Sequence, residues 1–238
     1  MSSLSRSSPL NPPAGRSFLP RVSSWLSRSS VGILDRAESL KWLGLFCMTV
    51  DHLGKFTSWR FSFSHPVGRF TAPLFFVAAA AQLCRPGVPA RVFRRLAVSA
   101  VLVFPFFFLV CHEHILPVLW TIGCGALLWQ SSKLPFRRAA LWVPSLTVLS
   151  CFGEYSVFGA FYLAGVGRLL SRDFSPGAFA WAFAGFLGQW FTEGPWQALA
   201  CVVAPVLLFV LPRLGRVRHV FLFYYLVQWP VFLAASLV

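Results

Sequence analysis

The chain has 238 residues, of which 57% are hydrophobic and 12% are charged, and its formal net charge is +14. Soluble domains typically contain about 45–50% apolar and about 25% charged residues, so this composition argues against a water-soluble fold. Nucleic-acid binding is also disfavoured, because the Arg and Lys residues lie in separate clusters between apolar stretches and not on one basic surface. The six Cys residues are scattered singly, without the paired spacing of a zinc site or a disulfide framework.

The N-terminal segment differs from the rest of the chain. Residues 1–38 are rich in Ser, Pro and Arg and contain no long apolar run. This composition predicts a disordered, basic cytoplasmic tail in front of a transmembrane domain at residues 39–238. Its Arg and Ser richness also fits an organelle transit peptide, which stays an alternative.

Nine apolar segments follow this tail. They lie at about residues 40–59, 66–84, 93–111, 114–131, 138–152, 156–171, 177–191, 195–212 and 218–236. A helix of about 20 apolar residues crosses a bilayer. We therefore expect an all-α fold, a polytopic integral membrane bundle of about nine transmembrane helices embedded in the lipid bilayer.

The basic residues alternate between loops and predict an orientation. The loops after the second, fourth, sixth and eighth segments contain Arg85, Arg91, Arg94 and Arg95, then Lys133, Arg137 and Arg138, then Arg168 and Arg172, then Arg213, Arg216 and Arg218. The opposite loops carry no Arg or Lys; they are His112-Glu113-His114, Gly153-Glu154-Tyr155 and Thr192-Glu193-Gly194. Since cytoplasmic loops are enriched in positive charge, we expect a bacterial inner-membrane protein with a cytoplasmic N-terminus and a periplasmic C-terminus.

The first outer loop is an exception to this charge rule, because it carries Lys55, Arg60 and Arg69. Just before it, Asp51 and His52 interrupt an apolar segment. Ionisable groups at such depth cost about 2.5–3.5 kcal/mol each and usually mark function.

A helix places Asp51 and Lys55 on one face and His52 beside them. An imidazole can take a proton from an attacking amine or hydroxyl, and a carboxylate can hold its ring. The same three residues also fit a purely structural reading, in which an Asp–Lys pair closes a helix interface around a satisfied core His.

Other polar residues have a functional and an ordinary interpretation. Arg69 could bind an anionic group through its planar donors, or extend to lipid headgroups. Glu154, Tyr155 and Glu193 could line the mouth of a cavity, or be loop residues. The pair His112 and His114 supplies too few ligands for a metal, so no metal site is expected.

Several short motifs follow one another along the chain. They are LKWLGLFCMTVDHLG from Leu40 to Gly54, VGRFTAPLFF from Val67 to Phe76, Arg94-Arg95-Leu96 followed by Pro105-Phe106, the run from Thr121 to Gly125, and the run from Tyr155 to Gly159. Over about residues 38 to 236 this set resembles the TraX family, including the related TrbP proteins of broad-host-range conjugative plasmids. Two positions depart from the family pattern: Gly44 replaces a usual Ala, and Phe232 occupies the place of a C-terminal His.

The resemblance implies acetylation of the N-terminal amine of a conjugative pilin subunit, with acetyl-CoA as co-substrate. Asp51 would orient His52, His52 would remove the proton of the amine, and Arg69 with Lys55 would stabilise the anion or hold a phosphate. Arg94, Arg95 and Arg138 are candidates for binding the CoA phosphates, although the positive-inside rule also explains them.

Three alternatives stay open. The chain could be an acetyltransferase with a glycan or lipid acceptor. It could instead be a non-catalytic membrane subunit of the conjugation machinery, in contact with its other proteins. A transporter is the third alternative, since intramembrane acids and His also build proton relays.

Overall fold

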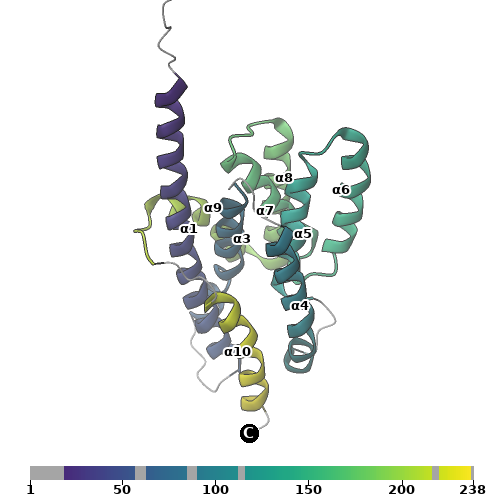
Figure 1. The fold of residues 1–238 in the computed structure, drawn as a ribbon. Coiled ribbons are helices and arrows are strands. Elements are labelled where there is room, and N and C mark those ends of the chain that lie inside the picture. The colour runs from purple at the N-terminus through teal and green to yellow at the C-terminus, as the bar shows by residue number, and fades with distance from the viewer. Residues whose placement is uncertain (1–18, 57–62, 85–89, 112–115, 216–219, 237–238) are drawn as a thin grey trace, which may run out of the picture.

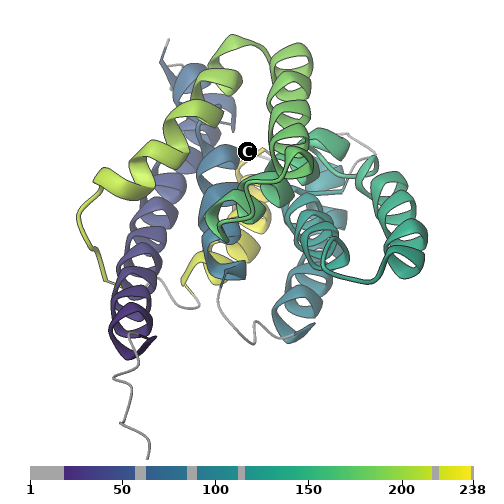
Figure 2. The ribbon, with the colours of Figure 1, turned by 90° about the horizontal axis from the view of Figure 1, so that it is seen from above.

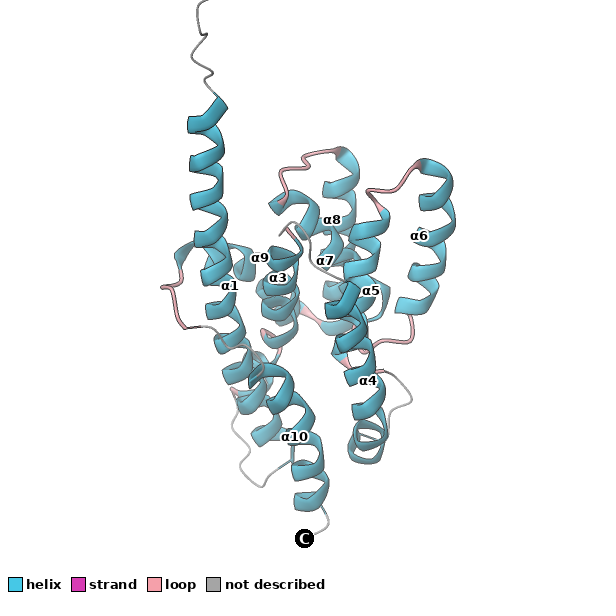
Figure 3. Cartoon of the chain, viewed as in Figure 1, coloured by secondary structure: helices cyan, strands magenta, loops and turns pink. Residues whose placement is uncertain are grey.

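A computed structural model describes residues 19–56, 63–84, 90–111, 116–215 and 220–236. These residues form helices joined by short connections (Figures 1 and 3). Within these ranges there is no strand, only an isolated bridge between Leu116 and Gly153. The predicted all-α class is therefore confirmed for the described residues.

The helices follow the predicted segments closely. They are α1 (Leu19–Phe56), α2 (Ser64–Gly68), α3 (Thr71–Leu83), α4 (Ala90–Cys111), α5 (Val118–Ser131), α6 (Phe136–Ser150), α7 (Ser156–Leu170), α8 (Pro176–Glu193), α9 (Pro195–Val210) and α10 (Val220–Ser236). Each predicted segment overlaps one long helix, and the second also overlaps the short α2. None of the helices in the described ranges combines the length and the sustained apolar character that a bilayer crossing requires.

Proline and glycine mark several helix boundaries. α8 and α9 each have Pro in their first turn, where the missing N–H group costs no hydrogen bond. Gly194 separates the two helices with a φ of 90°, which Gly adopts without the penalty of a side chain. The chain can therefore turn sharply between α8 and α9.

α1 begins earlier than the apolar pattern predicts. It is helical from Leu19, so the second half of the predicted tail continues into the first segment as one helix, while residues 1–18 lie outside the described residues. Pro20 lies in the first turn, and the next Pro is Pro66, so no proline interrupts this stretch. α1 extends well beyond the other helices at one end (Figure 1). The predicted division at residue 38 stays a prediction.

α3 is the central helix of the bundle. It packs against α1, α5, α7 and α9, and most of its side chains are buried. The view from above shows it surrounded by these neighbours (Figure 2). Leu74 and Phe76 are among the largest fully buried side chains of the core.

One end of the bundle is fixed by polar contacts to the middle of α1. Gln82, near the end of α3, donates to Glu38 (Nε2···Oε1, 2.9 Å), and Arg36 donates to the carbonyl oxygen of Phe209 at the end of α9 (2.7 Å). The C-terminal ends of α3 and α9 therefore meet α1 near residue 38. We call this the basic end, because the sequence places Arg clusters after these helices.

Candidate functional site

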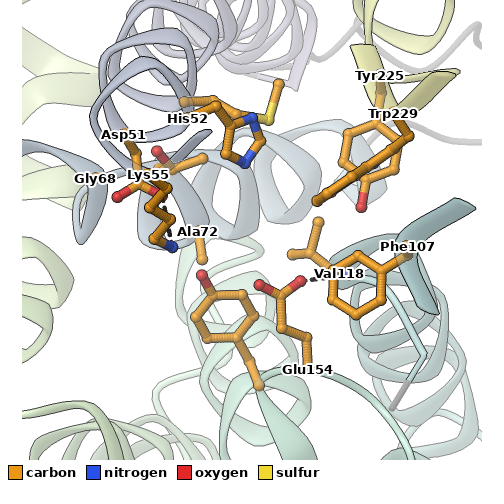
Figure 4. Close-up of a pocket in the computed structure, with 13 residues that line it drawn as sticks. Asp51, His52, Lys55, Gly68, Ala72, Phe107, Val118, Glu154, Tyr225 and Trp229 are labelled. Carbon is orange, nitrogen blue, oxygen red and sulfur yellow. Dashed lines mark hydrogen bonds and ion pairs between the residues drawn. The ribbon is translucent and has the colours of Figure 1, made fainter. Parts of the chain in front are cut away.

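A pocket of about 370 Å³ lies at the opposite end of the bundle, around the last turns of α1 (Figure 4). Six helices and the connection between α6 and α7 contribute to its wall. The lining residues are Met48, Asp51, His52, Lys55, Gly68, Thr71, Ala72, Phe107, Val118, Glu154, Tyr155, Tyr225 and Trp229. Three of the four predicted catalytic residues are thus brought together, with two of the three predicted cavity-mouth residues.

Asp51 and Lys55 form the predicted pair one helical turn apart. The Lys55 Nζ atom lies 2.9 Å from Oδ2 of Asp51. The Asp51 side chain is largely buried whereas Lys55 is more than half exposed. Lys55 therefore reaches from the pocket towards its opening, and its charge balances the buried carboxylate.

Gly68 allows α2 to approach Asp51. A Cβ atom on Gly68 would lie 2.1 Å from Oδ1 of Asp51 and 2.4 Å from its Cγ. These distances are far below van der Waals contact, so a larger residue would displace the carboxylate. Gly68 belongs to the motif from Val67 to Phe76, and Asp51 to the motif from Leu40 to Gly54. The two motifs meet here because Gly68 has no side chain.

A side chain of α10 holds His52. Its side chain is buried, with Nδ1 3.1 Å from Oε1 of Gln228, and its ring centroid lies 5.3 Å from that of Trp229. The sequence predicts Asp51 as the residue that orients this ring, and this role stays a prediction; the structure shows Asp51 in an ion pair with Lys55 and the His52 ring hydrogen-bonded to Gln228.

Aromatic side chains form the wall opposite Asp51. Phe107 of α4 packs edge-on against Trp229 of α10, with ring centroids 4.9 Å apart, and Tyr225 lies 6.3 Å from Trp229 in the same manner. Figure 4 shows this apolar wall facing the polar side formed by Asp51 and Lys55. One side of the pocket is therefore charged and the other aromatic.

Two hydroxyl groups add hydrogen-bonding capacity. The Thr71 Oγ1 atom is buried and has no hydrogen-bond partner within the described structure. Burial raises the pKa of Tyr155 well above its ordinary value, and the nearby carboxylates of Glu154, Glu193 and Asp51 raise it further. The Tyr155 hydroxyl therefore stays protonated near neutral pH and can donate a hydrogen bond.

Arg69 lies beside the pocket and is not one of its lining residues. Its guanidinium forms an ion pair with Glu193 at the end of α8, and its Nη2 atom lies 3.2 Å from Nε2 of His65. Because both charges also act on Tyr155, the ion pair lies close to the pocket edge. The predicted anion-binding Arg is therefore already paired with a carboxylate.

The predicted cofactor-binding residues are not brought to this pocket. Arg94 and Arg95 lie near the start of α4, about 18 Å along the helix from Phe107 at 1.5 Å per residue. The side chain of Arg94 lies outside the described structure, and Arg95 is exposed. Arg138 is exposed in the first turn of α6, the helix whose last turn accepts a hydrogen bond from Trp120 near the pocket.

Some other predicted features lie outside the described residues. These are Arg60, the His112-Glu113-His114 loop and the side chain of Phe232, whose backbone belongs to α10. Among the residues that the structure describes, no three His, Cys, Asp or Glu side chains are arranged to hold a metal ion.

The sequence model of the TraX protein family matches residues 36–236. The chain belongs to the TraX family. Membership makes this TraX protein a conjugation-related protein. No curated protein and no solved structure matches the chain.

Gln228, Trp229 and Thr71 are site residues that the TraX sequence pattern does not predict. On the last helix the family pattern has a His at the position of Phe232. Gln228 lies one turn before that position and 176 residues after His52. A polar residue in an otherwise apolar helix is the only sign of Gln228 in the sequence, since it is the sole polar amide of α10.

Proposed function

We propose that this TraX-family protein is a membrane-embedded acetyltransferase that uses acetyl-CoA to acetylate the N-terminal amine of a conjugative pilin subunit. The observation that carries the proposal is the pocket in which a buried His52 lies beside Asp51 and Lys55. Buried ionisable groups that converge on a cleft are typical of catalytic sites. Membership in the TraX family supports a role for this site in conjugation.

The transfer needs a base and hydrogen-bond donors. The amine nitrogen attacks the thioester carbonyl carbon, a C–N bond forms, and the C–S bond breaks. His52 takes the proton of the amine and returns it to the departing CoA thiolate, so no net proton is consumed. Lys55, Thr71 and Tyr155 line the same pocket and supply donors for the negative charge that develops on the thioester oxygen.

Arg69 and the basic end complete the proposal. Arg69 would contribute to anion binding only after exchanging its partner Glu193 for a substrate group. We assign the binding of the CoA phosphates to Arg94, Arg95 and Arg138. This role fits the Arg and Lys clusters that the sequence places in the loops after every second apolar segment. The acetyl thioester would then have to extend along the bundle to reach His52.

The inner membrane is the proposed location. Large apolar side chains are exposed on several helices of the bundle; examples are Leu102 on α4, Leu141 on α6, Phe191 on α8, Val206 on α9 and Phe223 on α10. Monomeric soluble proteins rarely expose apolar patches larger than a few hundred Å². Lipid contact over this surface would account for the exposed side chains.

Intact-mass analysis of the cognate pilin tests the proposal. We expect a gain of one acetyl group, about 42 Da, in cells with wild-type protein and no gain in cells with the deletion or with His52→Ala, since general-base catalysis contributes about 10²–10⁴-fold. Phe46→Ala removes an exposed aromatic ring from the same helix and should leave acetylation intact.

Identical pilin masses in all strains would contradict the proposal. A mass change on a glycan or lipid that depends on His52 would identify a different acceptor for the same site. A conjugation defect in the deletion strain that His52→Ala and Asp51→Ala do not reproduce would instead indicate a non-catalytic subunit of the conjugation machinery.

A further inference from the structure

The orientation of His52 is determined by a side chain from the other end of the chain. His52 and Gln228 are both buried, with 8% and 5% of their surfaces exposed, and 3.1 Å separates Nδ1 from Oε1. We propose that Gln228 is a positioning residue that keeps His52 in the tautomer protonated on Nδ1, so that Nε2 carries the basic electron pair. This inference rests on the function proposed above, in which His52 is the base.

The direction of the hydrogen bond follows from the chemistry of its atoms. A carboxamide oxygen only accepts hydrogen bonds, so the imidazole Nδ1 must donate to it. In a neutral imidazole the nitrogen that is not protonated carries the lone pair. Gln228 therefore selects between two tautomers that would otherwise have similar energies.

Met48 fixes which end of the Gln228 amide faces His52. The Nε2 atom of Gln228 lies 3.8 Å from Sδ of Met48 and donates to it. A thioether sulfur accepts weakly and never donates. Turning the amide round would place two acceptors, oxygen and sulfur, against each other and would lose this contact. The amide orientation, and through it the tautomer of His52, is set by a residue one turn before His52 on α1.

The charges around His52 explain why a neutral partner matters. On its own helix Asp51 and Lys55 neutralise each other as an ion pair, and Glu154 lines the pocket wall from the α6–α7 connection. α4 and α10 contribute aromatic rings to the pocket, and Tyr155 contributes a protonated hydroxyl. A carboxylate in place of Gln228 would add a negative charge directly at Nδ1 and stabilise the imidazolium.

Two substitutions at residue 228 separate positioning from packing. Gln228→Leu preserves approximate size and removes the acceptor, so we expect pilin acetylation to fall at least about tenfold, the usual loss when a partner of a functional His is removed. Gln228→Glu restores an acceptor and should recover most of this loss. Its pH–rate profile should move to higher pH on the acidic side, because a stabilised imidazolium must lose its proton before it can act as a base.

Gln197→Leu is the matched control. Gln197 is a fully buried amide of α9 that donates to Gln189 and does not line the pocket. Its removal tests the general cost of losing a buried glutamine, and we expect an unchanged pH–rate profile. Equal activity of Gln228→Leu and wild type, or an unshifted profile in Gln228→Glu, would overturn the inference while leaving acetylation itself established.

A second readout does not depend on activity. The ¹⁵N chemical shifts of the His52 ring, assigned by comparison with His52→Gln, report which nitrogen is protonated. We expect protonated Nδ1 in wild type and in Gln197→Leu, and a mixture of tautomers in Gln228→Leu. Protonated Nε2 in wild type would overturn the inference. If wild-type protein does not acetylate pilin, the proposed function fails, and these spectra still decide the role of Gln228.

Discussion

Gly68 controls the position of the Asp51 carboxylate on α1. Replacing it with Ala would place a methyl group 2.1 Å from Oδ1 of Asp51. Gly→Ala in a helix usually stabilises by about 1 kcal/mol, but here we expect a loss of about 1–3 kcal/mol from overpacking. Pilin acetylation should fall as well, because Asp51 and Lys55 must move. Thermal unfolding and pilin mass analysis measure the two effects.

Gly177→Ala serves as the control for Gly68→Ala. Its new methyl group would lie 3.5 Å from the guanidinium of Arg168, which is an ordinary contact. We expect wild-type acetylation and no loss of stability. Wild-type behaviour of Gly68→Ala would show that the close approach of α2 to Asp51 is not required.

The three predicted catalytic residues that line the pocket share one helix, whereas the predicted Glu154 and Tyr155 lie in the connection between α6 and α7. Asp51, His52 and Lys55 stand out because ionisable groups are rare in apolar segments and helical spacing groups them. The partner of His52 could not be predicted in this way. Helical spacing says nothing about which of several distant helices faces a residue, and the nearest carboxylate, Asp51, is taken by Lys55.

At the level of elements, Ser39 joins α1 to the connection between α9 and α10. Its hydroxyl donates to the carbonyl oxygen of Pro212 (2.6 Å) and accepts from the backbone N–H of Leu214 (2.9 Å). Ser39→Ala would leave both groups without this partner, so we expect a loss of about 1–3 kcal/mol. At about 2–4 °C per kcal/mol, a lower Tm should be measurable.

Ser145→Ala is the matched control for the Ser39 substitution. The Ser145 hydroxyl is exposed and bonds only to Leu141 of its own helix, so its Tm should stay within about 1 °C of wild type, as for most surface substitutions. An equal Tm for Ser39→Ala and Ser145→Ala would show that the contact with the α9–α10 connection contributes nothing measurable.

The helices themselves were largely predictable, because runs of apolar residues are separated by Pro, Gly and charged residues. Two differences have local causes. The second segment divides into α2 and α3 at Arg69 and Phe70, where Arg69 turns towards Glu193. α1 starts before its apolar segment because no proline interrupts the chain between Pro20, in the first turn of the helix, and Pro66.

For the whole molecule, the proposed membrane orientation can be tested at the two ends of α8. Phe174 precedes this helix and Thr192 lies in its last turn, and both are exposed. In a Cys-free background we expect Thr192→Cys to react with a membrane-impermeant thiol reagent in intact spheroplasts. Phe174→Cys should react only after the membrane is permeabilised, because positive charge keeps its end in the cytoplasm.

The opposite labelling pattern would reverse the orientation, and labelling of both sites in intact spheroplasts would contradict a membrane crossing by α8. The sequence predicts orientation from loop charge alone. The same charge pattern predicts Arg95 and Arg138 at the ends of the helices opposite Asp51 and His52, and in the structure these two Arg residues lie away from the pocket.

The pairing of His52 with Gln228 also has a consequence for biosynthesis. The ribosome makes α1 first, and Gln228 of α10 is added 176 residues after His52. Until α10 docks, His52 has neither its hydrogen-bond acceptor nor the ring of Trp229 beside it. A nascent or prematurely terminated chain would therefore contain Asp51 and His52 without the pocket wall that α10 provides.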